Sequence, residues 1–264
     1  NQEIYIGTKY FGANQCADSR AISFRCNTPQ SAAVRPNYTL RITPYSDMYL
    51  CVAYGNASPQ SVRAKAGQEY TFTTTLTTMD DTQILVYCAE SIQAINDLSA
   101  CYIRANDFSA AKRLKTLIIG SNVTGYSNPF ITTLSIKDNT LLETLDIRNC
   151  TNLTGELNFS GCPNLITLLA EGTSITGVTF APYGKVETAH LPATLNSLSL
   201  NNLNSLTDLT LAGYNSLIAL VCEYGSYDPL QILTSAIRTL QIVRILGIDW
   251  TFNTTNLLNS VYAK

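Results

Sequence analysis

Charged residues are scarce in this sequence. Only 14% of its 264 residues are charged, the net charge is −2, and there is one histidine, whereas soluble domains average about 25% charged residues. A nucleic-acid backbone is neutralised by clustered Lys and Arg, but between Arg148 and Arg238 the only such residue is Lys185. We therefore expect no nucleic-acid partner.

Long apolar runs are missing as well. No stretch approaches the roughly 20 apolar residues that a membrane-spanning helix needs, so we expect no membrane insertion. The N-terminus has no starting Met and no basic segment followed by an apolar run. We therefore expect that a leader has been removed or that the chain is a piece of a longer one.

Motifs for metals and cofactors are also absent. The eight cysteines contain no Cys-x-x-Cys pair, which argues against a zinc ribbon or a thioredoxin-type centre. Glycine-rich phosphate loops and metal-spaced His/Cys clusters are missing too, so we expect no metal and no cofactor. The even number of cysteines allows disulfides, and the state of the N-terminal cysteines stays open.

Short runs of alternating apolar and polar residues fill the first 90 positions. Turn residues separate them, which is typical of an antiparallel sheet. We predict a β-sandwich-like domain over 1–90 and a capping or linker segment over 91–113, in which 107–111 forms a short helix or a turn. The runs are Ala21–Cys26, Tyr38–Thr43, Met48–Tyr54, Glu69–Leu76 and Gln83–Cys88.

A repeat, L-x-x-L-x-[LI], begins at Leu114. Its second apolar position falls at 134, 145, 157, 168, 178, 189, 198, 209 and 220. This spacing of 9 to 12 residues is half of a usual leucine-rich coil, so two units make one turn. The pattern predicts a mainly β leucine-rich-repeat solenoid over 114–264. Positions 145, 168, 189 and 209 would stack on one face, with 134, 157, 178, 198 and 220 on the other.

Two cysteines fit the corner of this repeat. Cys150 and Cys162 occupy the Asn-or-Cys position of the leucine-rich consensus, where Asn139 stands one unit earlier. We expect both thiols to be buried, because the side chain at this position turns inward. We also expect both to be reduced, because units half a coil apart place them at opposite corners.

Several strings within the repeat are more specific than the consensus. They resemble leucine-rich tail or virion structural proteins of phages and prophages of gut bacteria, and the likeness runs from about Gln83 to the C-terminus. It implies a tail-associated component without catalytic residues, usually followed by further modules, so position 264 is expected to be a cut or processed end. The strings are GYSNP (125–129), NTLLETLDIRNC (139–150), LNFSGCPNL (157–165), TSITGV (173–178), HLPATL (190–195) and GIDWT (247–251).

The outward positions differ between the two predicted faces. One face carries small side chains, Ser135, Asn158, Thr179, Ser199 and Val221. The other is chemically varied and is our candidate binding face. Stacked threonines can simply pack across strands, but a ladder of hydroxyls beside a carboxylate and an imidazole could also hold a glycan or a partner strand. The candidate residues are Thr144, Asp146, Thr167, Leu169, Thr188, His190, Asp208 and Thr210.

Catalysis is not expected. His190 is two coils from Asp146, so about 9–10 Å separates their backbones, too far for the Asp–His contact of a triad. We interpret His190 as a plain exposed side chain, or alternatively as a contact to a next module. Glycoside cleavage needs two carboxylates in a cleft. We interpret the acidic pair at 80–81 as a turn, and nothing in the sequence indicates a cleft around Glu143 and Asp146.

The combined expectation is a non-catalytic structural or adhesive component of a phage tail or similar extracellular assembly. Its partners would be other virion or assembly proteins, further copies of itself, or a host-surface glycan. Its place would be the virion, the cell surface or the extracellular space. A secreted bacterial leucine-rich-repeat adhesin is the main alternative, and a glycan-cleaving enzyme is the third.

Overall fold

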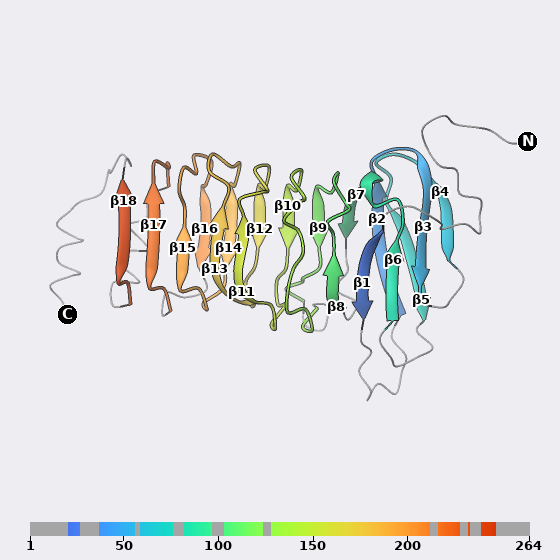
Figure 1. The fold of residues 1–264 in the computed structure, drawn as a ribbon, viewed down its shortest axis with the longest axis horizontal. Coiled ribbons are helices and arrows are strands. Elements are labelled where there is room, and N and C mark those ends of the chain that lie inside the picture. Colours follow the sequence, from blue (N-terminus) through green and yellow to red (C-terminus); the bar gives the residue numbers. More distant parts are fainter. Residues whose placement is uncertain are drawn as a thin grey trace, which may run out of the picture.

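The regular secondary structure of the described residues is almost entirely β-strand (Figure 1). The computed structural model describes residues 21–26, 37–55, 59–75, 82–96, 103–123, 128–211, 216–227, 232 and 239–246. Its strands are joined by turns and one short 3-10 helix, η1 (Ala89–Ser91). Within these ranges no helix has the length and apolar character to cross a membrane.

The strands form three sheets. An eight-stranded sheet has the order β16-β14-β12-β10-β9-β7-β2-β5, and two five-stranded sheets accompany it. In that order its members are β16 (Asp208–Leu211), β14 (Thr188–Leu191), β12 (Thr167–Leu169), β10 (Thr144–Asp146), β9 (Thr116–Ile118), β7 (Ile92–Asn96), β2 (Asn37–Pro44) and β5 (Tyr70–Thr75). The opposite sheet contains β11 (Thr154–Phe159), β13 (Ser174–Phe180), β15 (Ser197–Ser199), β17 (Ala219–Glu223) and β18 (Ile242–Leu246). The N-terminal sheet contains β4 (Gln60–Ala64), β3 (Met48–Tyr54), β6 (Thr82–Val86), β1 (Ile22–Cys26) and β8 (Ile103–Asp107).

The repeat forms a β-solenoid of about six coils, which confirms the predicted architecture at that level. Strands of successive coils pair in parallel on both sides of the solenoid. Positions 145, 168, 189 and 209 are in register in the eight-stranded sheet. Positions 157, 178, 198 and 220 are in register in the opposite sheet. Both columns match the predicted half-coil spacing, because burying every inward leucine requires this register.

One predicted position departs from the columns. Leu134 is only half-buried and belongs to no strand. The amide of Asn106 instead replaces part of a backbone ladder, accepting a hydrogen bond from Ser135 N–H at 3.0 Å and donating to the Thr133 carbonyl at 2.9 Å. A side chain can satisfy the backbone there, so this coil needs no strand pair.

The five predicted N-terminal runs coincide with β1, β2, β3, β5 and β6, and these strands pair antiparallel as expected. The structure adds β4, and it places β7 and β8 in the segment expected to be a cap or linker. Residue 107 ends β8, and 108–111 form a turn, which is the second of the two predicted alternatives. The predicted turn at 80–81 and everything beyond 246 lie outside the described residues.

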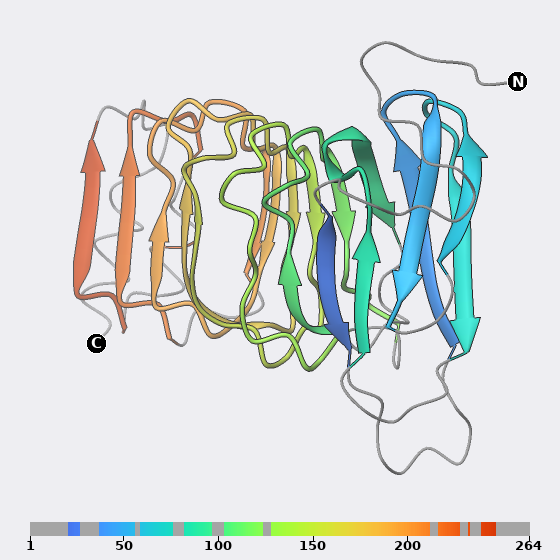
Figure 2. The ribbon, with the colours of Figure 1, turned by 45° about the vertical axis from the view of Figure 1, so that its right-hand side comes forward.

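The eight-stranded sheet runs through the expected domain boundaries. β7 pairs antiparallel with β2 on one side and parallel with β9 on the other. Figure 2 shows the solenoid strands following directly on the N-terminal strands. The predicted domain limits stay a prediction, but a hydrogen-bonded ladder links the two regions across them.

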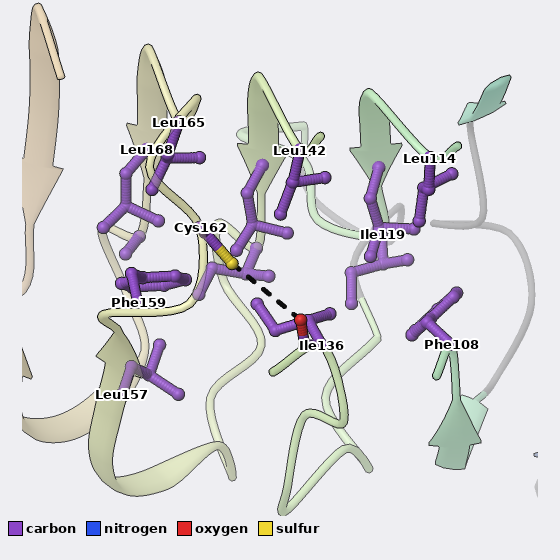
Figure 3. Packing of buried hydrophobic residues seen from close by; sticks show 14 of the residues in the cluster. Phe108, Leu114, Ile119, Ile136, Leu142, Leu157, Phe159, Cys162, Leu165 and Leu168 are labelled. Carbon is purple, nitrogen blue, oxygen red and sulfur yellow. Dashed lines mark hydrogen bonds between the residues drawn. The ribbon is translucent and has the colours of Figure 1, made fainter. Parts of the chain in front are cut away.

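The structure confirms the prediction that Cys150 and Cys162 are buried and not disulfide-bonded. The Cys150 thiol lies 3.7 Å from the Ile119 carbonyl of the preceding coil, and the Cys162 thiol lies 3.9 Å from the Ile136 carbonyl (Figure 3). Burial raises the thiol pKa to about 12 for Cys150 and about 11 for Cys162, so neither is a ready nucleophile. In the N-terminal region, Cys51 is disulfide-bonded.

Asn139 occupies the corresponding corner one unit earlier and makes stronger hydrogen bonds there than the two cysteines do. It is fully buried, and its amide nitrogen donates to the carbonyls of Phe108 at 2.9 Å and Ala111 at 2.8 Å. The amide thus satisfies two acceptors of the previous coil, whereas each cysteine reaches one through a weak donor.

Candidate functional site

The structure brings the eight candidate residues together on the outer face of the solenoid half of the eight-stranded sheet. They form two in-register columns across β10, β12, β14 and β16. Each strand has a leucine or alanine turned inward between its two outward positions, which is the period of two that places both columns on one face. The first column contains Thr144, Thr167, Thr188 and Asp208, and the second contains Asp146, Leu169, His190 and Thr210.

β9 extends both columns by one position that the sequence analysis did not include. Thr116 pairs with Thr144, and Ile118 pairs with Asp146. The signal was present in the sequence, because the first repeat unit, Leu114–Ile119, contains both residues at the same offsets.

Asp146 is less accessible than its outward position suggested. It is only 5% exposed, because the Arg148 guanidinium lies over its carboxylate with contacts of 2.6 to 3.2 Å. The Arg148 backbone N–H also donates to Asp146 Oδ1 at 3.0 Å. This charge-assisted hydrogen bonding, opposed by burial, raises the pKa of Arg148. The side chain that Asp146 presents outward is therefore covered by a cation.

His190 is not the plain exposed side chain that we expected. Its Nδ1 lies 3.0 Å from Glu171 Oε1, and its Nε2 lies 2.9 Å from Asp208 Oδ2. Glu171 follows β12 and Asp208 begins β16, so the imidazole on β14 joins the coils on either side of it. The hydrogen bond to Asp208 is the main cause of a raised His190 pKa, burial opposes the rise, and the negative charges of both carboxylates add to it. Protonated, the ring donates to both acids.

The sequence analysis missed Glu171, although a signal existed. Arg148 and Glu171 each stand three residues after the inward leucine of their strand, Leu145 and Leu168. The negative charge of Glu171 contributes to the raised pKa of Arg148. Charges of alternating sign therefore run along the coils from Asp146 and Arg148 through Glu171 and His190 to Asp208.

A second ion pair lies at the start of this face. Lys115 Nζ contacts Glu143 Oε1 at 2.8 Å, and both side chains are more than a third exposed. Exposed pairs of this kind contribute about 0.2–1 kcal/mol. The Lys115–Glu143 pair therefore adds little to the free energy of unfolding, and its main effect is to position two side chains on this face.

The imidazole of His190 does not have the contacts of a catalytic triad. Both nitrogens of the imidazole are occupied by carboxylates, so neither is directed at a nucleophilic hydroxyl as a catalytic triad requires. Within the described ranges, no group of three His, Cys, Asp or Glu side chains is placed to hold a metal ion.

The outward residues of the opposite sheet match the bland face that the sequence predicted. Asn158 and Thr179 are exposed, and Ser199 and Val221 are half-buried. β18 adds Arg244, whose Nε lies 2.5 Å from Glu223 Oε1.

Comparison of the chain with protein-family models, curated proteins and solved structures found no match. The functional interpretation therefore depends on the sequence and the geometry described above.

Proposed function

We propose that this protein is a non-catalytic structural and adhesive component of a phage tail or a similar extracellular assembly. The observation that supports this most is the pair of in-register columns on one face of the solenoid. They place threonine hydroxyls, the His190 imidazole and the exposed Asp208 carboxylate on one sheet. Such a surface can hold a glycan or the surface of another assembly protein through repeated polar contacts.

We further propose that the coils are leucine-rich repeats and that the N-terminal strands form a sandwich-like module. The support is the L-x-x-L-x-[LI] repeat with Asn or Cys at its corner, and the antiparallel pairing of β1, β2, β3, β5 and β6. The resemblance to virion proteins of gut phages supports the assembly role. The disulfide at Cys51 supports a location outside a reducing cytoplasm.

The proposal is tested by locating the chain on particles. Phage particles induced from the source bacterium would be imaged by negative stain after gold labelling with an antibody to this chain. We expect label at one fixed place on the tail, and the same antibody pre-absorbed with the purified protein should give none. Label confined to bacterial cells, with none on particles, would contradict the proposal and favour the secreted adhesin.

The enzyme alternative has a separate test. The purified protein would be incubated with polysaccharide from the bacterial surface, and the chain length of the polysaccharide would be followed by size-exclusion chromatography. We expect an unchanged elution profile. Release of oligosaccharides by the protein, and by a His190→Gln variant to a lesser degree, would establish a glycan-cleaving activity instead.

A further inference from the structure

A column of left-handed residues follows the opposite sheet at one corner of the coils. Tyr183, Asn202 and Tyr224 have φ values of 57°, 55° and 55°. Each follows a strand of that sheet, namely β13, β15 and β17. The three residues therefore occupy the same turn in three successive coils.

Backbone hydrogen bonds connect these three turns. The N–H of Tyr183 donates to the Asn202 carbonyl at 3.2 Å, and the N–H of Asn202 donates to the Glu223 carbonyl at 2.6 Å. Counting three residues on from the paired Ser199 and Val221 places Asn202 beside Tyr224. The same count from Thr179, the partner of Ser199, ends at Pro182, so Tyr183 lies one position beyond this pair. The two tyrosines are thus two coils apart, or about 9–10 Å at about 4.8 Å per strand.

Tyrosine is an unfavourable choice for this backbone. Left-handed φ values are disfavoured for residues with bulky side chains and suit Gly and Asn. On the other side of the solenoid the chain uses those residues, with Asn149 at φ 57° and Gly172 at φ 74° in the turns after β10 and β12. Backbone strain at a position where Gly or Asn would be relaxed indicates that the tyrosine side chain itself has a role.

The two rings are also among the most exposed in the described chain. Tyr183 is 75% exposed and Tyr224 is 59% exposed, so neither has been kept in order to fill the core. Both rings lie in exposed turns at the same edge of the opposite sheet. Between them, the half-buried Asn202 has an amide that makes no hydrogen bond within the described residues. This forms a ridge of two aromatic platforms with a polar group between them.

We propose that this tyrosine ridge binds a neutral polysaccharide. Sugar rings stack on exposed aromatic faces through their C–H groups, and the spacing of the two tyrosines is close to the length of one disaccharide unit. The amide of Asn202 can both donate to and accept from sugar hydroxyls. None of the three side chains is charged, which matches a neutral chain. The ridge lies apart from the face of the eight-stranded sheet, and it deepens the proposed adhesive role by naming a class of partner.

The test is electrophoresis of the full chain through native gels that contain hydroxyethyl cellulose, mannan or laminarin, beside a gel without polysaccharide. We expect at least one polysaccharide to retard the parent protein. Tyr183→Asn and Tyr224→Asn should each weaken retardation by roughly three- to tenfold, the range for loss of one aromatic contact, and the double variant should abolish it. Tyr183→Phe should keep it.

The Asn variants should fold, because Asn tolerates the left-handed conformation and Asn202 already adopts it in the coil between the two tyrosines. Their melting temperatures should equal or exceed that of the parent, while Tyr45→Asn, at a 46% exposed tyrosine elsewhere, should bind normally. The inference is overturned if no gel retards the parent, if the Asn variants are retarded fully, or if lost retardation accompanies a lower melting temperature.

The same gels separate this inference from the proposed function. Retardation that depends on the tyrosines but not on Leu169 supports the ridge even if particles carry no label. Particle binding that depends on the tyrosines while no gel retards the parent would indicate a protein partner, and the polysaccharide assignment would then be wrong.

Discussion

Single residues connect one coil of the solenoid to the next, and His190 is the clearest case. Its pKa is raised above the ordinary value of 6.5, first by the hydrogen bond to Asp208. A raised folded-state pKa means that protonation stabilises the fold. This contribution is complete below about pH 6.5 and is lost as the pH rises through the folded-state pKa.

We therefore expect His190→Gln to lower the free energy of unfolding by about 0.5–1 kcal/mol at pH 6, and by less at pH 9. Urea unfolding of parent and variant at both pH values measures the difference. Thr210→Ala, on the same column, should show no such pH dependence. An equal loss at pH 6 and pH 9 would mean that the ion pairs of His190 do not stabilise the fold.

Corner residues provide a second comparison at this scale. Asn139→Ala removes two buried hydrogen bonds, although the carbonyls of Phe108 and Ala111 each keep one backbone donor, and we expect it to destabilise the fold by about 2 kcal/mol. Cys150→Ala removes one weak sulfur contact and a small apolar group, so we expect about 1 kcal/mol. Thermal unfolding of both variants checks the order. Equal losses would show that the amide of Asn139 does no more than fill space.

At the scale of elements, close packing of neighbouring coils decides which turns tolerate change. A Cβ at Gly120 would lie 2.2 Å from the backbone nitrogen of Arg148, and backbone cannot move aside as a side chain can. We expect Gly120→Ala to cost about 3 kcal/mol, at the upper end of overpacking. Its melting temperature should fall well below that of Ser121→Ala, the neighbouring control. Similar values for the two would mean that these coils do not approach so closely.

The sequence predicted two kinds of element, the alternating N-terminal strands and the strands of the repeat, and it specified the register only for the second kind. Inward positions such as Leu145 and Leu168 recur at a fixed spacing, and burial allows only one register for them. β7 was missed because it precedes the first repeat unit and therefore lacks the repeat pattern. It pairs antiparallel with β2 on one side and parallel with β9 on the other. The strand expected at Leu134 is absent because the Asn106 side chain satisfies that backbone.

The candidate site was predictable to the same extent. The two columns follow from the repeat, and the structure adds Thr116 and Ile118 at their start. Of the two partners of His190, Asp208 was among the predicted residues, whereas Glu171 was not, because it lies in the turn beyond β12. Which side chains reach across from one turn to the next strand depends on corner geometry that a strand period does not encode.

The whole molecule behaves as one continuous β structure in which the N-terminal region begins the solenoid. β7 supplies the partner strand of β9, and the carbonyls bonded by Asn139 belong to Phe108 and Ala111. A chain that starts at residue 114 would leave this edge unpaired and the amide without acceptors. We expect it to unfold at a lower urea concentration than a chain that starts at residue 91. An equal midpoint would show that the solenoid is independent of 91–113.

The account depends most on which side of each strand faces the core, and the neighbouring pair Leu168 and Leu169 tests that directly. Leu168 is fully buried, whereas Leu169 is half-buried on the outer face beside His190. The measurement is the melting temperature of Leu168→Glu and Leu169→Glu beside the parent. We predict that Leu168→Glu loses the cooperative transition, because it buries an unpaired charge. Leu169→Glu should stay within about 0.5 kcal/mol of the parent. A Leu169→Glu variant that is the more destabilised of the two would contradict the register, and with it the proposed binding face.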